Sequence, residues 1–320
     1  MFKKTETAVR ARSSRMTVSM RAKRFRKSLP LTLMALPMML YFIVFNYLPL
    51  YGLVLPFKDY KFAKGFFGSD WVGFDNFKFL LDNEQLNTAV INTVLYNFVF
   101  IFGGIILSVI IALLLYEVTA KAVKLHQTLL YLPHYISWVV VAFAAKALLD
   151  MDYGLINKIL AYFGADPKQW YSVPEYWPGI LIISALWKTC GSDAVLYYAA
   201  LMGTDKSLFE AAKIDGANKL QITRYITIPS IKGIIIMMTI LKIGKIFYGD
   251  FGLFYNLTLN SPLLYETTDI LDTYVYRALM TLGDVGISSA VGFVQSVLGF
   301  ILVIVTNLVV KRIDKDSALF

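Results

Sequence analysis

The sequence predicts an all-α, polytopic membrane protein with about six transmembrane helices. Of its 320 residues, 57% are hydrophobic and only 17% are charged, which is more apolar side chain than a soluble chain of this length could bury. A helix needs roughly 20 predominantly apolar residues to cross the hydrocarbon core of a bilayer. Six stretches of the chain meet this requirement: 29–57, 89–117, 125–149, 179–203, 226–247 and 285–310.

The first stretch follows a basic segment and is interpreted as a retained span. Its apolar run is too long for the hydrophobic region of a signal peptide, and it has no small-residue cleavage site. Because proline lacks a backbone N–H and kinks or breaks a helix, the outer end of this span is expected to be irregular. The prolines of this stretch are Pro30, Pro37, Pro49 and Pro56.

The second stretch, 89–117, contains two small residues at a spacing that lets helices approach closely. Gly104 and Ser108 are about one helical turn apart and therefore lie on the same face. Small residues at this spacing are typical of tightly packed transmembrane helices. We expect this helix to pack closely against another span.

Basic residues in the connections indicate the direction in which the chain crosses the membrane, because they favour the cytoplasmic side. With a cytoplasmic N-terminus, the inner segments hold 19 lysines and arginines and the outer segments hold 7. Ten of the 31 basic residues precede Ser28, where they suit an anionic membrane surface. The sequence thus predicts a basic cytoplasmic tail (1–28), a transmembrane domain (29–311) and a cytoplasmic C-terminal tail (312–320).

Several classes of active site are excluded by what the sequence lacks. No Gly-x-x-x-x-Gly-Lys-Ser/Thr loop is present to cradle the phosphates of ATP, and no Gly-x-Ser-x-Gly or His-Glu-x-x-His motif frames a catalytic centre. One cysteine permits no intramolecular disulfide, and two isolated histidines do not indicate a metal site. We expect this chain to have no catalytic residues and to bind no metal or cofactor.

A short polar helix is predicted between the fourth and fifth spans, in "SLFEAAKIDGANK" (207–219). Ser207 at the N-cap and Glu210 three residues later form the Ser-x-x-Glu pattern of a capping box. Gly216 suits the left-handed conformation that commonly ends a helix. Two helical turns are marginally stable alone, so another surface must hold this helix. Spacing alone leaves open whether that surface belongs to this protein or to a partner.

The stretch "EAAKIDGANKLQITRYITIP" resembles the Glu-Ala-Ala loop of ABC-importer permeases, through Glu210, Ala211, Ala212, Gly216, Ile226 and Pro229. Ile228 stands where leucine is usual, and Asp215 and Ala217 look like the carbohydrate branch of the family. The resemblance implies that 204–229 is a cytoplasmic coupling loop whose helix contacts an ATPase subunit. The coupling residues that it implies are Glu210, Ala211, Ala212, Asp215, Gly216 and Ala217.

The similarity extends over nearly the whole chain beyond the basic tail. Segments such as "YLPHYISWVVV", "DILDTYVYRALM" and the terminal "DSALF" look like the lipo-oligosaccharide or polysaccharide permease subfamily, which includes alginate and aldouronate importers. The resemblance implies a type I ABC importer permease, multi-pass in a bacterial cytoplasmic membrane. Its partners would be a second permease, two ATPase subunits that hold ATP and Mg, and an extracytoplasmic solute-binding protein. The substrate would be an oligosaccharide, moved inward by alternating access.

Two other classes of function remain open at this point. An integral membrane enzyme that acts on lipid or polysaccharide would show Asp, Glu or His clustered at one membrane face, whereas the acids here are scattered through the outer loops. An ion-coupled secondary transporter of polysaccharide or lipid-linked sugar would need carboxylates within the membrane. Only Asp193 lies inside a predicted span.

The predicted spans also contain five lysines, namely Lys146, Lys188, Lys232, Lys242 and Lys245. Lys146 and Lys232 lie near the ends of their spans, where long side chains can reach the headgroups. The other three should face the protein interior or a watery path, because an ammonium group that faces lipid is costly. In one interpretation, Lys188 pairs with Asp193 and Lys245 reaches Asp250. In the other, Lys188 and Lys242 line the substrate path with Trp187 as a sugar-stacking face, which favours anionic oligosaccharides such as uronates.

Overall fold

The computed structural model describes residues 29–314 and residue 318, and it divides the chain into two compact units, Met1–Val54 and Leu55–Phe320. The predicted basic tail lies outside the described residues, as does most of the C-terminal tail. Residues 29–42 form an α-helix that continues into a π-helical turn, η1 (Ile43–Tyr47), and a 3-10 helix, η2 (Leu48–Phe57), whose last three residues belong to the second unit. The first span therefore ends irregularly, as its prolines predict.

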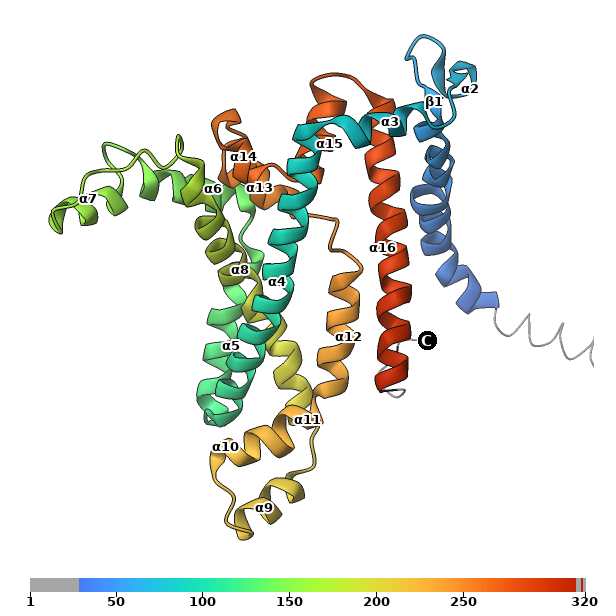
Figure 1. The fold of residues 1–320 in the computed structure, drawn as a ribbon. Helices are drawn as coiled ribbons and strands as arrows, with labels where there is room; N and C mark the ends of the chain where they lie inside the picture. The colour runs from blue at the N-terminus through green and yellow to red at the C-terminus, as the bar shows by residue number, and fades with distance from the viewer. Residues whose placement is uncertain (1–28, 315–317, 319–320) are drawn as a thin grey trace, which may run out of the picture. The chain divides into compact units, whose positions relative to one another are not determined.

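The second unit is a bundle of long helices. Within the described residues of the whole chain, four helices are long and apolar enough to cross a membrane, and the number is six if each of two bent helix pairs counts as one span. In this unit the long helices are α4 (Glu84–Glu117), α8 (Trp177–Met202) and α16 (Val285–Ile313). Helix α4 packs along α8, and α12 (Lys232–Ile243) lies against α16 and α4 (Figure 1). The predicted all-α fold with about six spans is confirmed.

Helices α4 and α8 approach closely where their facing side chains are small. Gly104 of α4 faces Leu186, and a Cβ placed on this glycine would lie 3.8 Å from the Leu186 Cδ2 atom. The buried hydroxyl of Ser108 donates to the backbone oxygen of Cys190 at 3.1 Å. The close packing predicted for the face that carries Gly104 and Ser108 is confirmed.

The predicted span 125–149 is not one continuous helix, because two helices with a sharp bend between them cover it. Helix α5 (Ala120–Tyr135) and helix α6 (Trp138–Leu149) meet at a bend of 91°. Ile136 and Ser137 between them are extended, and the Ser137 side chain accepts from the backbone N–H of Val140 as the N-cap of α6. A polar cap residue after the last turn of α5 thus starts a new helix in a new direction.

The predicted fifth span, 226–247, is shorter than expected and is preceded by a second bend. A segment of α10 (Lys219–Ile222), η4 (Thr223–Thr227) and α11 (Ile228–Ser230) meets α12 at 58°. Helix α12 ends at Ile243, and turns continue the chain to Phe247. Lys245, which the sequence places inside this span, therefore lies beyond the helix.

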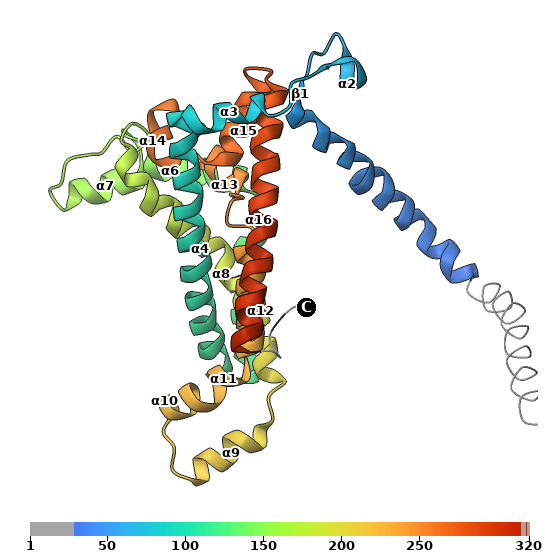
Figure 2. The same cartoon turned by 45° about the vertical axis from the view of Figure 1, so that its right-hand side comes forward.

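Short elements cluster at the two ends of the second unit. Figures 1 and 2 both place α9 (Lys206–Ile214) and α10 at one end and α13, α14 and α15 at the other. The remaining elements are β1 (Lys58–Asp59), α2 (Gly65–Gly68), β2 (Asp70–Trp71), α3 (Asp75–Asp82), α7 (Leu155–Tyr162), η3 (Pro174–Tyr176), α13 (Phe251–Leu257), η5 (Pro262–Leu264), α14 (Tyr265–Thr268) and α15 (Leu271–Met280). The two strands pair antiparallel with Lys58 opposite Trp71, and they are a small addition to the predicted all-α fold.

Two clusters of buried side chains hold these ends. At the end with α13, Trp177 and Phe254 pack in one cluster and are almost fully buried. At the other end, Tyr197 of α8 and Ile231 before α12 belong to a second cluster. The second cluster fixes the point at which the chain leaves the bundle for α9 and returns from α11.

Candidate functional site

Helix α9 contains the Glu-Ala-Ala sequence and begins earlier than the sequence predicts. Asp205 is its N-cap, and the Asp205 carboxylate accepts from the backbone N–H of Ser207 at 2.9 Å. That hydrogen bond lowers the pKa of the Asp205 carboxyl below its usual range. The predicted capping box of Ser207 and Glu210 is therefore wrong, because Ser207 lies inside the first turn. Asp205 supplies the side-chain oxygen that the first backbone N–H groups require.

A capping box is present at the next helix instead. The Asn218 side chain accepts from the backbone N–H of Gln221 at 2.9 Å, and the Gln221 side chain accepts from the backbone N–H of Asn218 at 2.8 Å. These two reciprocal bonds begin α10 only a few residues after α9 has ended. The loop is thus built from two separately capped helices rather than from one.

The end of α9 follows the prediction made for Gly216. This glycine has a φ of +80°, in the left-handed region that other residues rarely adopt. The Gly216 N–H donates to the oxygen of Lys213 at 3.1 Å, and the Ala217 N–H donates to the oxygen of Ala212 at 2.9 Å. This pair of bonds satisfies the last carbonyl groups of the helix and turns the chain sharply.

The residues around α9 divide into an exposed face and a buried anchor. Glu210, Ala211 and Asp215 are exposed, and the Glu210 side chain makes no hydrogen bond or ion pair with a described residue. Phe209 lies on the other side and is 9% exposed. Its ring contacts that of Tyr116 on α4, with 5.7 Å between the ring centroids. The Glu-Ala-Ala face is therefore free to meet a partner, while Phe209 holds the helix to its own protein.

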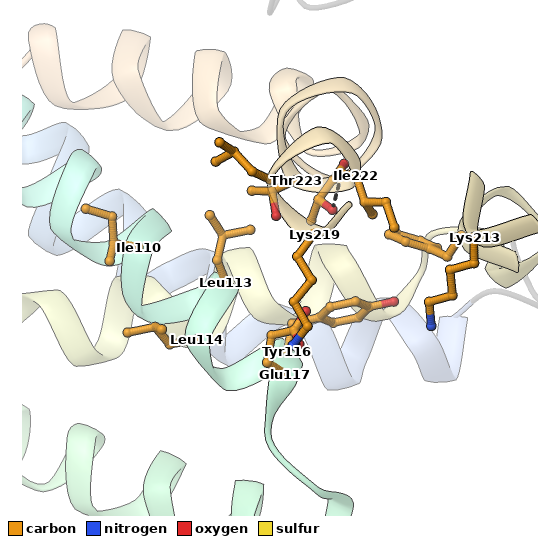
Figure 3. Close-up of a pocket in the computed structure, with 12 residues that line it drawn as sticks. Ile110, Leu113, Leu114, Tyr116, Glu117, Lys213, Lys219, Ile222 and Thr223 are labelled. Carbon is orange, nitrogen blue, oxygen red and sulfur yellow. Dashed lines mark hydrogen bonds and ion pairs between the residues drawn. The ribbon is translucent and has the colours of Figure 1, made fainter. Parts of the chain in front are cut away.

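A cavity of about 570 Å³ separates the loop 204–229 from the adjacent end of α4 (Figure 3). Ile110, Leu113 and Leu114 line it from α4, and Lys219, Ile222 and Thr223 line it from the loop. The Lys219 ammonium bonds the Glu117 carboxylate across the opening at 2.7 Å. At the base of the loop, the Thr204 hydroxyl donates to that of Ser230 at 3.2 Å. The loop is therefore tied to α4 and closed where it joins α8 and α11.

The three lysines predicted to face the interior have different environments. The Lys188 ammonium is buried and donates to the backbone oxygens of His134 at 2.9 Å and Ile136 at 2.6 Å. It does not pair with Asp193, so the predicted Lys188–Asp193 pair is wrong. Asp193 instead bonds Lys242 at 2.5 Å, which joins α8 to α12. The predicted contact of Lys245 with Asp250 is also wrong, because Lys245 forms no ion pair in the described part of the chain.

A second cavity, of about 760 Å³, lies beside these residues. Lys242 and Lys245 both line it, whereas Trp187 and Lys188 are not among its described lining residues. Trp187 is 51% exposed elsewhere on α8. The residues that line the cavity are Asn97, Phe100, Ile101, Trp138, Ala185, Thr189, Leu241, Lys242, Lys245, Tyr248, Gly249, Asp250 and Leu253.

Sequence reasoning missed Trp138 and Asp250 as members of this cavity. The Trp138 indole N–H donates to the Asp250 carboxylate at 2.6 Å, which joins residues far apart in the sequence. A partial signal was present, because Ser137 is a good N-cap and would have placed Trp138 at the start of a new helix. Nothing in the local sequence indicated that Asp250 would lie beside it.

The sequence of this chain is similar to those of known transport proteins. The family described as "Binding-protein-dependent transport system inner membrane component" matches residues 104–315. The polygalacturonan/rhamnogalacturonan transport system permease protein YteP of Bacillus subtilis (strain 168) is 36% identical over 291 residues, which cover 90% of this chain and 89% of that protein. Protein LplB of the same organism is 34% identical over 288 residues, which cover 90% of each chain.

Two solved structures have the same fold as this chain. One is the crystal structure of a bacterial ABC transporter involved in the import of the acidic polysaccharide alginate, with a TM-score of 0.83 and 32% identity over 91% of this chain and 98% of that chain. The other is the bacterial alginate ABC transporter in complex with an alginate pentasaccharide-bound periplasmic protein, with a TM-score of 0.82 and 32% identity over 92% and 98%. The fold and the sequence thus agree along nearly the whole chain.

Proposed function

This chain belongs to the family of binding-protein-dependent transport system inner membrane components, and on that basis we propose that it is a permease subunit of an ATP-driven oligosaccharide importer. The observation that carries the proposal is the geometry of α9. Glu210 and Ala211 of its Glu-Ala-Ala sequence are exposed at one end of the membrane-spanning helices, Ala212 is half-buried, and its Phe209 side is anchored to α4. A helix exposed in this way suits docking into a groove of a separate ATPase subunit.

The partners follow from the family and from the groups that the sequence lacks. This chain has no phosphate-binding loop, so ATP and Mg belong to two partner ATPase subunits. A second permease completes the passage, and an extracytoplasmic solute-binding protein delivers the sugar. The solved alginate transporter with its periplasmic protein supports this last partner by similarity.

The coupling loop provides a route from ATP to the spans. When the ATPase subunits close, they move α9, and two connections carry the movement into the bundle. One connection leads to α4 and consists of two contacts, the Phe209–Tyr116 ring contact and the Lys219–Glu117 ion pair. The other is the short α11, which leads directly into α12. The spans then alternate between inward-facing and outward-facing states that ATP and substrate favour to different degrees.

The direction of the chain follows from the same assignment. Because ATP is cytoplasmic, α9 and its neighbours lie on the cytoplasmic side, and α13 to α15 lie on the outer side. Both termini are then cytoplasmic, with 1–28 as a basic tail, 29–311 as the permease domain and 312–320 as the C-terminal tail. The excess of basic residues in the inner segments supports this orientation.

The proposed substrate is an acidic, uronate-type oligosaccharide. The name of YteP refers to polygalacturonan and rhamnogalacturonan, and the similar solved structure belongs to an importer of the acidic polysaccharide alginate. Both proteins are similar to this chain over most of its length. Lys242 and Lys245 line the second cavity, and Lys245 has no acidic partner among the described residues, which favours an anionic guest over a neutral one.

Purification and transport test the proposal together. The tagged chain, purified from its own bacterium, should bring down an ATPase and a second permease. Proteoliposomes that carry this complex in their membrane, with the solute-binding protein on the side opposite the coupling loop, should then take up a uronate oligomer. Uptake should occur only when ATP is supplied on the coupling-loop side. Uptake that an ion gradient drives without ATP would support a secondary transporter, and chemical conversion of the sugar would support a membrane enzyme.

A further inference from the structure

The wall of the 760 Å³ cavity contains an indole ring that is held from three sides. The Trp138 N–H donates to Asp250, and the Lys188 ammonium lies 5.1 Å from the centre of the Trp138 ring. Gly252 gives the ring room, because a Cβ at that position would lie 2.6 Å from the Trp138 Cδ1 atom. Three hydrogen bonds from Lys188 to backbone oxygens at the end of α5 hold its ammonium in place. The orientation of the ring is therefore fixed before any ligand arrives.

Most polar groups of this cavity are already bonded within the protein. The Asn97 amide donates to the oxygens of Ile246 and Tyr248, and the Tyr248 hydroxyl bonds that of Ser296 at 2.7 Å. The Thr189 hydroxyl donates to a carbonyl of its own helix. The donor hydrogens of these groups are therefore used within the protein, which leaves none of them to bind a ligand carboxylate.

The charged side chains of the cavity differ in whether they have a partner within the protein. Lys242 bonds Asp193, and Asp250 accepts from the Trp138 indole and from the backbone N–H of Leu253. Lys245 is exposed, and in the described part of the chain it has no acidic partner. Lys245 is therefore the cation that is available to a ligand here.

We propose that this cavity is a subsite for one acidic sugar residue, in which Trp138 stacks on the apolar face of the ring and Lys245 binds its carboxylate. The proposal rests on the importer function proposed above and names the residues that select the substrate. The cavity volume falls within the range of about 300–1,000 Å³ that is usual for ligand pockets. An ammonium–carboxylate contact supplies both charge and direction, whereas the indole supplies a flat apolar surface. Asp250 and Lys188 are positioning residues for the indole.

The test compares trigalacturonate with its methyl ester, which has nearly the same shape but no negative charge. Both are offered to proteoliposomes that contain the complete complex, ATP and an unchanged solute-binding protein. Lys245→Met should raise the KM for trigalacturonate about tenfold or more, since a charge-assisted hydrogen bond is lost, and should leave the KM for the ester and both kcat values nearly unchanged. Lys245→Arg should restore the preference for the charged sugar.

Further variants test the indole and its support. Trp138→Ala should raise the KM for both sugars, whereas Trp138→Phe should retain much of the affinity. Asp250→Leu should act like Trp138→Ala and add little when the two are combined, while Asp250→Asn, which keeps one acceptor oxygen for the indole but loses the second acceptor, should raise the KM less than Asp250→Leu does. Full additivity of Asp250→Leu and Trp138→Ala would contradict the positioning role.

Two outcomes separate this subsite from the importer function itself. If wild-type complex takes up neither sugar in an ATP-dependent way, the proposed function is wrong. If wild-type complex takes up trigalacturonate and Lys245→Met leaves its KM unchanged, or affects both sugars equally, the importer stands and the subsite is wrong.

Discussion

The ammonium of Lys188 donates to the backbone oxygen of Ile136 at 2.6 Å, at the point where α5 ends and α6 begins. The last carbonyl groups of a helix lack partners within that helix, and a cation near them is favourable. Lys188 comes from α8, so a side chain of one helix stabilises the break between two others. The 91° bend therefore depends on a tertiary contact as well as on the local cap at Ser137.

Replacing Lys188 with methionine should destabilise this bend. Lys188→Met keeps most of the side-chain volume but removes the donor from three carbonyl groups, which should lower the free energy of unfolding by about 3 kcal/mol. Thermal unfolding of the detergent-purified complex measures the loss. Lys146→Met is the matched control, because Lys146 is exposed and should be nearly neutral. Equal melting of the two variants would show that the bend does not need Lys188.

Two buried tyrosines should respond in opposite ways to the same chemical change. The Tyr197 hydroxyl is buried without a hydrogen-bond partner in the described part of the chain, whereas the Tyr96 hydroxyl donates to the oxygen of Thr267 at 2.7 Å. Tyr197→Phe should therefore raise the free energy of unfolding by about 1 kcal/mol, and Tyr96→Phe should lower it by a similar amount. Thermal unfolding in detergent measures both. A loss of stability in Tyr197→Phe would mean that its hydroxyl has a partner.

The cap of α9 should make this helix sensitive to acid. A hydrogen bond from the Ser207 N–H lowers the pKa of the Asp205 carboxyl in the folded protein. A group whose pKa is lower in the folded state stabilises that state above its unfolded pKa, and this contribution is lost as the pH falls through the folded pKa. The protection of the first amides of α9 against hydrogen exchange, measured relative to the intrinsic exchange rate at each pH, should therefore fall in acid.

Asn is an equally good N-cap that does not titrate, so Asp205→Asn should remove this acid dependence while it preserves protection at neutral pH. Asp205→Ala should exchange faster at every pH. If wild type and Asp205→Asn respond alike to acid, a group other than Asp205 controls the start of α9.

The number and order of the spans could be predicted because the requirement is local. Twenty apolar residues in a row leave few alternatives, and both α4 and α16 lie within a few residues of their predicted bounds. The bend at Ile136 could not be predicted in the same way, because the residue that stabilises it from outside is Lys188 of another helix. The hydropathy of a segment carries no information about a contact with another helix.

The errors at the candidate sites have similar physical causes. Ser207 and Asp205 are both good N-cap residues. The Ser-x-x-Glu pattern favours Ser207 as the N-cap of α9, whereas Asp205 is the N-cap in the structure. Lys188 was paired with Asp193 because they are close in sequence, yet Lys242 reaches Asp193 across the interface of two helices. Gly216 was predicted correctly because its left-handed conformation depends on the residue itself.

ATP-driven uptake by a Glu210→Ala complex tests the coupling role of α9 most directly. Because Glu210 is exposed and makes no contact with the described part of its own chain, this change should not alter folding or assembly. Loss of a charged contact with the ATPase should nevertheless reduce uptake by about tenfold or more, while Glu84→Ala at the opposite end of α4 should leave it unchanged. Normal uptake by a fully assembled Glu210→Ala complex would contradict the account and leave α9 as a capped connection between two spans.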